Sequence, residues 1–491
     1  MRRRTRVNIA ALILLIGLLF DADRGLSQTA VQPAQNNQID AYITREMQTR
    51  RIPGAAIAVV EKGKVILKRA YGMANLEAES PVKTNSVFEL ASVTKPFTAT
   101  AIMMLVEEGK IQLDNPVSAY LDHTPEVWKN ITVRHLLTHT AGFPEEYYVE
   151  CDGSPAMNTT ARRQFDRIAQ APLLFPPGER AQYSDPGYIL LGMIIGKASG
   201  QPYREFIQKR IFERLQMADS SVLDQSRIIK NRVSPYSIRN GKLLRGRRDW
   251  QIEVPSNFGL YSTVEDLAKF DAALLNGTLL KKSSLDQMWT PAKLSRGQDA
   301  LIFSDPYGFG WSLGDIRGHR VTEHGGFSGT HMLRFLDDGL TIIVLTNLDL
   351  ASGNRPAELA RGIAGLFKPE YQPPPKLIPQ TDPDPQITVG LRSLLAEMAE
   401  GKGASSMSSA HLAFFNDLEP QRLRNLAQQL RTLKSITYIT SDYVEGRGLK
   451  RLGEPVSRIR YYKAELAEKI YYFTFWLTKE GKVAYLRFNP E

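Results

Sequence analysis

Ser92 and Lys95 stand three residues apart at the start of a predicted helix that continues through Pro96 to Glu108. A hydroxyl in this place lies at the positive end of the helix dipole, which favours a negatively charged oxygen. A lysine three residues later lies on the same face and can reach that hydroxyl. If the amine is partly desolvated, its pKa falls and it can accept or relay a proton. The pair suits a serine nucleophile, and the alternative is a chance pair on a helix surface.

Two other patterns could carry chemistry. The segment Gly310 to Gly314 has the Gly-x-Ser-x-Gly form of a nucleophile elbow, with Ser312 at its centre, but an elbow needs a strand, a sharp turn and a helix. The residues that follow are turn-like, so we interpret Ser312 as structural. His135 and His139 have the spacing of metal ligands on a helix, yet no Glu follows His135 and no third ligand is evident. We predict no metal and no other cofactor.

The composition is that of a soluble globular protein, with 43% hydrophobic and 23% charged residues, and a length of 491 residues suggests two or more domains. Cys151 is the single cysteine and cannot form an intrachain disulfide, so we interpret it as incidental. The net charge is +10. No recognition motif accompanies this charge, so we predict no nucleic-acid partner.

The N-terminus has the features of a signal peptide. Four arginines within residues 2–6 precede an apolar run from Val7 to Phe20, and Gly25 and Ser27 put small residues at a cleavage site. The run is shorter than the roughly 20 residues that a spanning helix needs. We therefore predict a signal peptide over residues 1–27, a periplasmic or secreted protein and no stable membrane anchor. An uncleaved anchor is the alternative.

A proline-rich linker is predicted over residues 370–385, because six prolines between Pro373 and Pro385 exclude a helix or a central strand. The linker separates a domain of residues 36–369 from a domain of residues 386–491. No catalytic pattern is found in the second domain, which we interpret as an accessory module.

Hydrophobic patterns place strands at both ends of the first domain and helices between them, which favours an α+β domain closed by its terminal strands. The predicted strands are 55–60, 65–67 and 340–346, and the predicted helices are 96–108, 187–200 and 263–276, the last with Thr263 as N-cap. The second domain is also predicted to be α+β. Its helices are 385–400 and 420–433, and its strands are 435–444, 457–466, 469–477 and 483–488.

The segment from Phe88 to Thr98, FELASVTKPFT, resembles the nucleophile segment of the beta-lactamase-related serine hydrolases. That family groups class C beta-lactamases, D-alanyl-D-alanine carboxypeptidases, D-aminopeptidases and beta-lactamase-like esterases. Further matching segments follow in the family's order: Ile131–Gly142, Phe175–Gly178, Tyr183–Tyr188, Gly259–Thr263 and His324–Gly326. The resemblance implies a beta-lactamase/transpeptidase-like α/β sandwich, an antiparallel sheet flanked by helices, beside a helical lobe. The active site would lie at the seam.

The resemblance also implies the role of Tyr183. The family's Tyr-x-Asn motif places a phenol near the nucleophile, where a cation can depress its pKa and let it move protons. By resemblance Tyr183 takes this role and Lys95 supplies the charge. Asp185 departs from the pattern, because an ionised Asp can only accept a hydrogen bond where Asn can also donate. We expect altered substrate contacts and a direct pair between Asp185 and Lys95.

His324, Gly325 and Gly326 stand where many relatives have Lys-Thr-Gly, and the glycines let a substrate approach the backbone. The resemblance implies an oxyanion hole from the backbone N–H groups of Ser92 and Phe327. Neutral His324 holds a substrate carboxylate less well than Lys would. The neutral His324 and the departure from the family pattern at Asp185 together favour an esterase or peptidase over an efficient beta-lactamase.

We therefore predict acyl transfer to water, with Ser92 as nucleophile and with Lys95 and Tyr183 moving protons. The substrate is a small molecule or a peptide: a small ester, a peptidoglycan-type D-amino peptide or a beta-lactam. A class C-like beta-lactamase is the nearest alternative. A non-catalytic cell-envelope binding protein is the alternative of another class. The sequence leaves the oligomeric state open.

Overall fold

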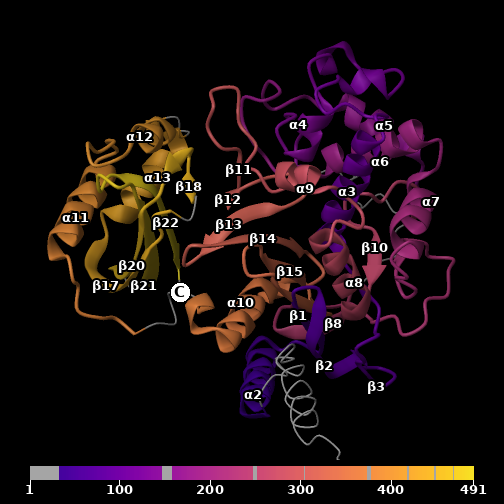
Figure 1. The fold of residues 1–491 in the computed structure, drawn as a ribbon, viewed down its shortest axis with the longest axis horizontal. Coiled ribbons are helices and arrows are strands. Elements are labelled where there is room, and N and C mark those ends of the chain that lie inside the picture. The colour runs from indigo at the N-terminus through magenta and orange to yellow at the C-terminus, as the bar shows by residue number, and fades with distance from the viewer. Residues whose placement is uncertain are drawn as a thin grey trace, which may run out of the picture.

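The computed structural model describes residues 33–145, 158–246, 251–303, 305–372, 378–416, 418, 420–446, 449–467 and 469–490. The predicted signal peptide, Cys151 and part of the predicted linker lie outside these residues. Two bodies are seen in Figure 1. We call residues 33–372 the large unit and residues 378–490 the C-terminal unit.

A seven-stranded antiparallel sheet forms the centre of the large unit. Its strand order is β13 (Ser312–Ile316), β14 (His319–Gly326), β15 (Thr330–Phe335), β16 (Leu340–Thr346), β1 (Gly54–Glu61), β2 (Lys64–Asn75) and β3 (Ser80–Pro81). Strands β1 and β16 pair antiparallel, from Ala55 opposite Thr346 to Glu61 opposite Leu340. The prediction that the terminal strands close this domain is confirmed.

Helices cover both faces of this sheet, and the alternation of β1 assigns its residues to the two sides. Ala55, Ile57 and Val59 pack with α2 (Pro33–Arg50) and α10 (Pro356–Phe367), whereas Ala56, Ala58 and Val60 belong to the core on the opposite face. Helix α8 (Val264–Leu275) packs on that second face, and its N-cap Thr263 accepts a hydrogen bond from Asp266 N, as predicted.

A largely helical lobe completes the large unit around α3 (Thr94–Glu107) and α6 (Asp185–Ser199). Its core is aromatic: the rings of Phe97 and Phe270 stack at 3.8 Å, and Trp128 meets Phe143 edge-on at 5.1 Å. The other helices of this unit are α4 (Val133–Leu137), α5 (Ala161–Gln170), α7 (Tyr203–Ile207) and α9 (Lys282–Met288). The short strands are β4 (Phe88–Glu89), β5 (Asn158–Thr159), β6 (Ser221–Val222), β7 (Tyr236–Arg239), β8 (Lys242–Arg245), β9 (Gln251–Ile252), β10 (Leu260–Ser262), β11 (Leu301–Ile302) and β12 (Asp305–Pro306).

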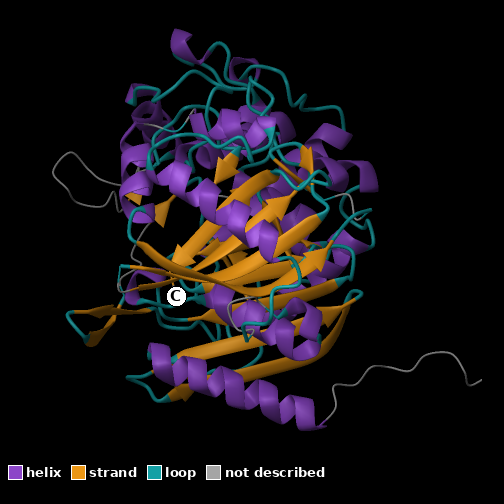
Figure 2. Cartoon of the chain, turned by 90° about the vertical axis from the view of Figure 1, so that its left-hand side faces the viewer, coloured by secondary structure: helices purple, strands orange, loops and turns teal. Residues whose placement is uncertain are grey.

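The C-terminal unit is a four-stranded antiparallel sheet against helices, seen from its own side in Figure 2. The strand order is β17 (Leu433–Tyr443), β20 (Arg458–Leu466), β21 (Lys469–Leu477) and β22 (Val483–Pro490), beside the short pair β18 (Lys450–Arg451) and β19 (Glu454–Pro455). Helices α11 (Pro385–Ala399) and α13 (Pro420–Leu430) and the four long strands were predicted. Helix α12 (Ser409–Asn416) was not, because eight residues carry too little periodicity.

The two units meet along β13, the edge strand of the large sheet. The side chain of Asp315 on β13 is almost fully buried, forms an ion pair with Arg451 and accepts a hydrogen bond of 3.0 Å from Trp476 Nε1. Arg317 pairs with Asp442 at 2.8 Å. These side-chain contacts dock one face of the C-terminal sheet on the large unit. Among the described residues, no helix is both long and apolar enough to span a membrane.

Candidate active site

A tight turn presents Ser92 ahead of α3. Residues Ala91–Val93 form one 3₁₀ turn, and Ala91 has a left-handed φ of 47°. The end of β14 packs on this turn: a Cβ at Gly326 would lie 2.1 Å from Leu90 O, so only glycine fits there. Thr330 Oγ1 donates to the same carbonyl at 2.7 Å. Ser92 itself is half-buried, at the seam between the sheet and the helical lobe.

Lys95 is fully buried in the first turn of α3, and hydrogen-bond partners surround its amine. Its Nζ donates to Ser92 Oγ at 3.2 Å, to Asp185 Oδ1 at 2.7 Å and to Asn257 O at 3.1 Å. The Tyr183 phenol also lies within hydrogen-bonding reach of Lys95. The expected pair between Lys95 and Asp185 is present.

The charge on Asp185 decides the protonation of Lys95. Burial by itself lowers the pKa of this amine, but the nearby Asp185 carboxylate raises it, and the balance lies above the ordinary value. The expectation of a lowered Lys95 pKa is therefore wrong for this chain. The buried amine stays charged at neutral pH because its carboxylate partner is 2.7 Å away.

Tyr183 lies two residues before α6, with its ring 4.6 Å from Lys95 Nζ. Burial raises the pKa of its phenol, and the charge of Lys95 opposes that rise without reversing it. The family-based expectation of a depressed Tyr183 pKa is wrong in its direction, so the phenol is protonated at neutral pH. The site consequently holds Lys95 as a cation beside a neutral Tyr183.

A buried group of aromatic rings lies behind Tyr183. The ring of His139 stands 4.5 Å from that of Tyr183 and 4.8 Å from that of Tyr307. His139 Nδ1 also accepts a hydrogen bond of 3.1 Å from Ser184 N, the residue after Tyr183. The sequence pattern indicated His139 only as a candidate metal ligand, and it did not indicate Tyr307 at all. His139 could have been found from its place in the matching segment Ile131–Gly142, whereas Tyr307 lies in none of the matching segments.

His324 is buried on β14 and joins this group through Tyr307. Its Nδ1 lies 2.8 Å from Gly325 O, which can only accept, so Nδ1 carries the proton and Nε2 accepts from Tyr307 OH at 3.0 Å. Burial, aided by the charge of Lys95, lowers the pKa of His324 to about 3. The side chain is therefore neutral at neutral pH.

Gly325 and Gly326 end β14, and Phe327 follows them in the turn to β15. The side chain of Phe327 is 52% exposed, and its carbonyl accepts from Leu350 N at 3.0 Å. The approach of Gly326 to Leu90 brings this turn against the segment that carries Ser92. An oxyanion hole from the amides of Ser92 and Phe327 stays a prediction.

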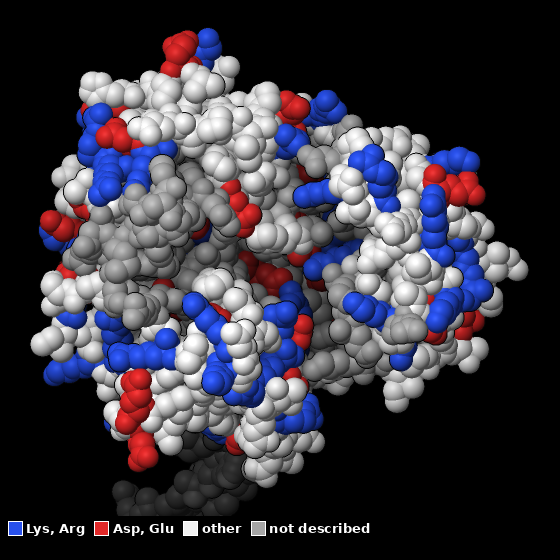
Figure 3. Space-filling model, turned by 180° about the vertical axis from the view of Figure 1, so that it is seen from behind, with Lys and Arg blue, Asp and Glu red and all other residues white. Residues whose placement is uncertain are grey.

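A cleft of about 850 Å³ opens beside Tyr183 and is lined by residues of both units. The large unit contributes Tyr183 and Phe303, and the C-terminal unit contributes Phe414, Leu418 and Tyr485. Figure 3 shows the surface hollowed between the two units, with basic and acidic side chains gathered there. This volume lies within the range of ordinary ligand sites, about 300 to 1,000 Å³.

Residues 39–365 match the sequence model of the family described as Beta-lactamase, which is more than half of the chain. The chain belongs to the beta-lactamase family of serine hydrolases. Penicillin-binding protein 4* of Bacillus subtilis is 31% identical to it over 344 residues, which cover 65% of this chain and 73% of that protein.

Two solved structures share the fold of this family member. EstCE1, described as a hydrolase with promiscuous acyltransferase activity, has a TM-score of 0.59 and 21% identity, and the match covers 67% of this chain and 98% of that one. The octameric penicillin-binding protein homologue from Pyrococcus abyssi has a TM-score of 0.60 and 22% identity, over 92% of this chain and 99% of that one. The predicted α+β fold of beta-lactamase/transpeptidase type is confirmed.

The two other sequence patterns that could have carried chemistry, around Ser312 and at His135, have structural roles in this beta-lactamase family member. Ser312 begins β13 and pairs with Glu323, so the strand–turn–helix that an elbow needs is missing around it. His135 forms a capping box with Thr132 at the start of α4. Within the described parts of the chain, no group of three or more His, Cys, Asp or Glu side chains could hold a metal ion.

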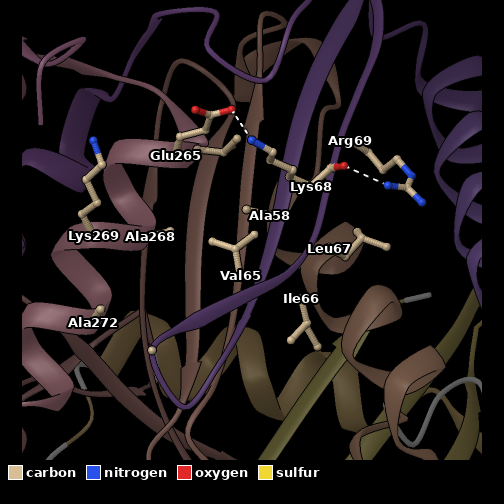
Figure 4. Close-up of a pocket in the computed structure, with 12 residues that line it drawn as sticks. Ala58, Val65, Ile66, Leu67, Lys68, Arg69, Glu265, Ala268, Lys269 and Ala272 are labelled. Atoms are coloured by element: carbon tan, nitrogen blue, oxygen red, sulfur yellow. Dashed lines mark hydrogen bonds and ion pairs between the residues drawn. The ribbon is translucent and has the colours of Figure 1, made fainter. Parts of the chain in front are cut away.

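A second hollow, of about 530 Å³, lies between β2 and α8 (Figure 4). Its wall includes Val65, Ala268 and the ion pair of 2.8 Å between Lys68 and Glu265. None of the candidate catalytic side chains lines it, so it is separate from the candidate site.

Proposed function

We propose that this protein is an exported serine hydrolase that forms an acyl-enzyme at Ser92 from a small ester or a D-amino peptide. The observation that carries the proposal is the hydrogen bond of 3.2 Å between Ser92 Oγ and the buried ammonium of Lys95. Family membership supports a serine nucleophile. Export rests on the predicted signal peptide of residues 1–27.

In the first step, Ser92 Oγ attacks the substrate carbonyl carbon and gives its proton to Lys95. Lys95 is already an ammonium, so it must release one proton as it takes another. Asp185 Oδ1, at 2.7 Å, is the acceptor in contact with it. The step leaves a negatively charged tetrahedral intermediate, a Lys95 that is still an ammonium and a neutral Asp185.

In the second step, Tyr183 acts as the acid. Its raised pKa keeps the phenol protonated in the resting site, so it can donate to the leaving oxygen or nitrogen as the intermediate collapses. The phenolate is stabilised by Lys95, 4.6 Å from its ring, and recovers a proton from Asp185 through that amine. The proton of Ser92 has then moved to the leaving group. Water hydrolyses the acyl-enzyme by the reverse sequence.

The charges of the pocket favour an ester or peptide over efficient hydrolysis of a beta-lactam. Asp185, when ionised, cannot donate to a substrate carbonyl, and His324 carries no charge with which to hold a carboxylate. Binding of the intermediate's oxygen by the amides of Ser92 and Phe327 completes the proposed site.

Covalent labelling tests the nucleophile. A fluorophosphonate probe is read by intact mass on the parent protein, Ser92→Ala and Ser312→Ala. We expect label on the parent and on Ser312→Ala, and none on Ser92→Ala. Label kept by Ser92→Ala would refute the proposed nucleophile, and an unlabelled parent would favour a non-catalytic cell-envelope binding protein.

A second candidate, a class C-like beta-lactamase, is favoured by one observation, the match of residues 39–365 to the family model described as Beta-lactamase. Nitrophenyl esters, D-alanyl peptides and nitrocefin should be compared as substrates of the parent protein. We expect kcat/KM to be highest for an ester or a D-alanyl peptide. Faster turnover of nitrocefin would replace the first proposal with the second.

A further inference from the structure

The cleft beside Tyr183 would be open on one side without the C-terminal unit. Phe414 on α12, Leu418 after it and Tyr485 on β22 form the wall that faces the large unit. These side chains are far in sequence from the nucleophile, yet they line the same cleft as Tyr183.

The hairpin β11–β12 links the C-terminal unit to Tyr183. At its tip, the Phe303 ring is 73% exposed and stands 5.4 Å from the ring of Tyr183. On its second strand, Asp305 pairs with Arg487 of β22 at 2.7 Å, and at its base Leu301 packs on the hydrophobic cluster that contains Tyr485. The C-terminal unit therefore holds the hairpin whose tip covers the candidate acid.

The lining indicates what the cleft would bind. Three basic and three acidic residues line it, so their formal charges cancel and favour neither a cation nor an anion. They are Arg180, Arg296, Arg422, Glu145, Glu179 and Asp299. The hairpin and the C-terminal unit add apolar surface, namely Leu301, Ile302, Phe303, Phe414, Leu418 and the ring of Tyr485. Such a surface favours ligands that bury apolar area against it.

We propose that the C-terminal unit completes a subsite for a neutral apolar arm of the substrate, an acyl chain or aryl group that extends from the scissile carbonyl. This inference rests on the proposed function, since the arm belongs to an ester or amide that acylates Ser92. The unit is then part of the substrate site, and its residues set chain-length preference.

The test compares kcat/KM for p-nitrophenyl octanoate and p-nitrophenyl acetate, as a ratio, on full-length protein. We expect the parent to prefer octanoate and Phe414→Ala to lower the ratio about tenfold, since a few methylene groups in an apolar pocket are worth factors of this size. Leu412→Ala is the matched control, because Leu412 lies partly buried on the same helix and does not line the cleft. It should keep the parent's ratio.

Phe303→Ala is a second variant for the case that Phe414→Ala does not fold. The Phe303 side chain is 73% exposed, so its removal leaves no cavity in the core. It should also lower the ratio. An unchanged ratio in both Phe303→Ala and Phe414→Ala would overturn the inference, as would a parent that prefers an ester with a terminal carboxylate.

The nucleophile is tested separately, so that the two proposals can fail independently. Ser92→Ala should lose turnover of both esters. If turnover survives in Ser92→Ala, the proposed function fails, whatever the ratio. If turnover depends on Ser92 but the ratio does not depend on Phe414 and Phe303, only the subsite fails.

Discussion

Two buried ion pairs of this protein have nearly the same length and different surroundings. Lys95 and Asp185 are 2.7 Å apart beside the half-buried hydroxyl of Ser92. Arg334 on β15 and Asp271 on α8 are 2.6 Å apart, both almost fully buried, and Thr341 Oγ1 donates to the same Asp271 oxygen at 2.8 Å. The Lys95–Asp185 pair contacts the candidate nucleophile Ser92, and the Arg334–Asp271 pair links helix α8 to strand β15.

The two pairs differ in whether the cation can release a proton and in how far the carboxylate is exposed to solvent. A guanidinium does not release its proton in proteins, whereas a lysine ammonium can exchange one with neighbours. Asp185 is 21% exposed and can meet a substrate, whereas Asp271 is 3% exposed. The same attraction therefore serves stability in one place and proton transfer in the other.

The largest effect is expected for Lys95→Arg. The charge is retained, but the proton relay between Ser92 and Asp185 is lost, so kcat/KM for a nitrophenyl ester should fall about 10³-fold. Arg334→Lys in the other pair is the control and should keep the activity within a few-fold. Thermal unfolding checks that both variants fold. Retained activity in Lys95→Arg would contradict the relay.

Breaking the second pair should cost stability. Asp271→Ala leaves Arg334 buried without its carboxylate, and the free energy of unfolding should fall by about 3 kcal/mol. Asp185→Asn should cost less, because Lys95 keeps Ser92 and Asn257 as acceptors. Urea unfolding of both variants measures this, and equal losses would remove the distinction between the pairs.

Asp185→Asn should change the pH dependence of acylation. Without the carboxylate, burial dominates and the pKa of Lys95 falls below its ordinary value. At neutral pH the relay lacks its acceptor, so we expect kcat to fall about 30-fold. As the pH rises through the lowered pKa, the neutral amine can take the Ser92 proton itself and the rate should recover. A pH profile parallel to that of the parent would argue against Asp185 as the proton acceptor.

The last prediction concerns the pH dependence of stability that comes from His324, whose folded pKa of about 3 lies below its ordinary value of 6.5. As the pH falls, His324 takes up a proton in the unfolded chain near pH 6.5 but in the folded protein only near pH 3. The free energy of unfolding therefore falls as the pH falls from about 6.5 toward 3, by at most about 1.4 kcal/mol per pH unit from this group. His324→Gln should lose less stability than the parent across that window. Identical slopes in urea unfolding would show that His324 is not the group responsible.

Several features of the fold follow from local sequence. The continuous apolar run Ala55–Val60 predicted a buried strand, and Thr263 predicted the start of α8, because both signals depend on neighbouring residues alone. The contact between Ser92 and Lys95 is of the same kind, since a separation of three on one helical turn brings side chains together. The pair of Lys95 with Asp185 was expected from matching motifs, and the structure contains it.

The sequence by itself determined the core strands, the main helices and the neighbourhood of Ser92. Tertiary structure decided the direction of the Lys95 pKa, because it depends on the balance between burial and a charge brought from 90 residues away. It also decided that His139 and Tyr307 stand behind Tyr183, and that Phe414 lines the cleft beside it. Such contacts join distant segments whose side chains meet only when the units pack, and no local period or motif encodes them.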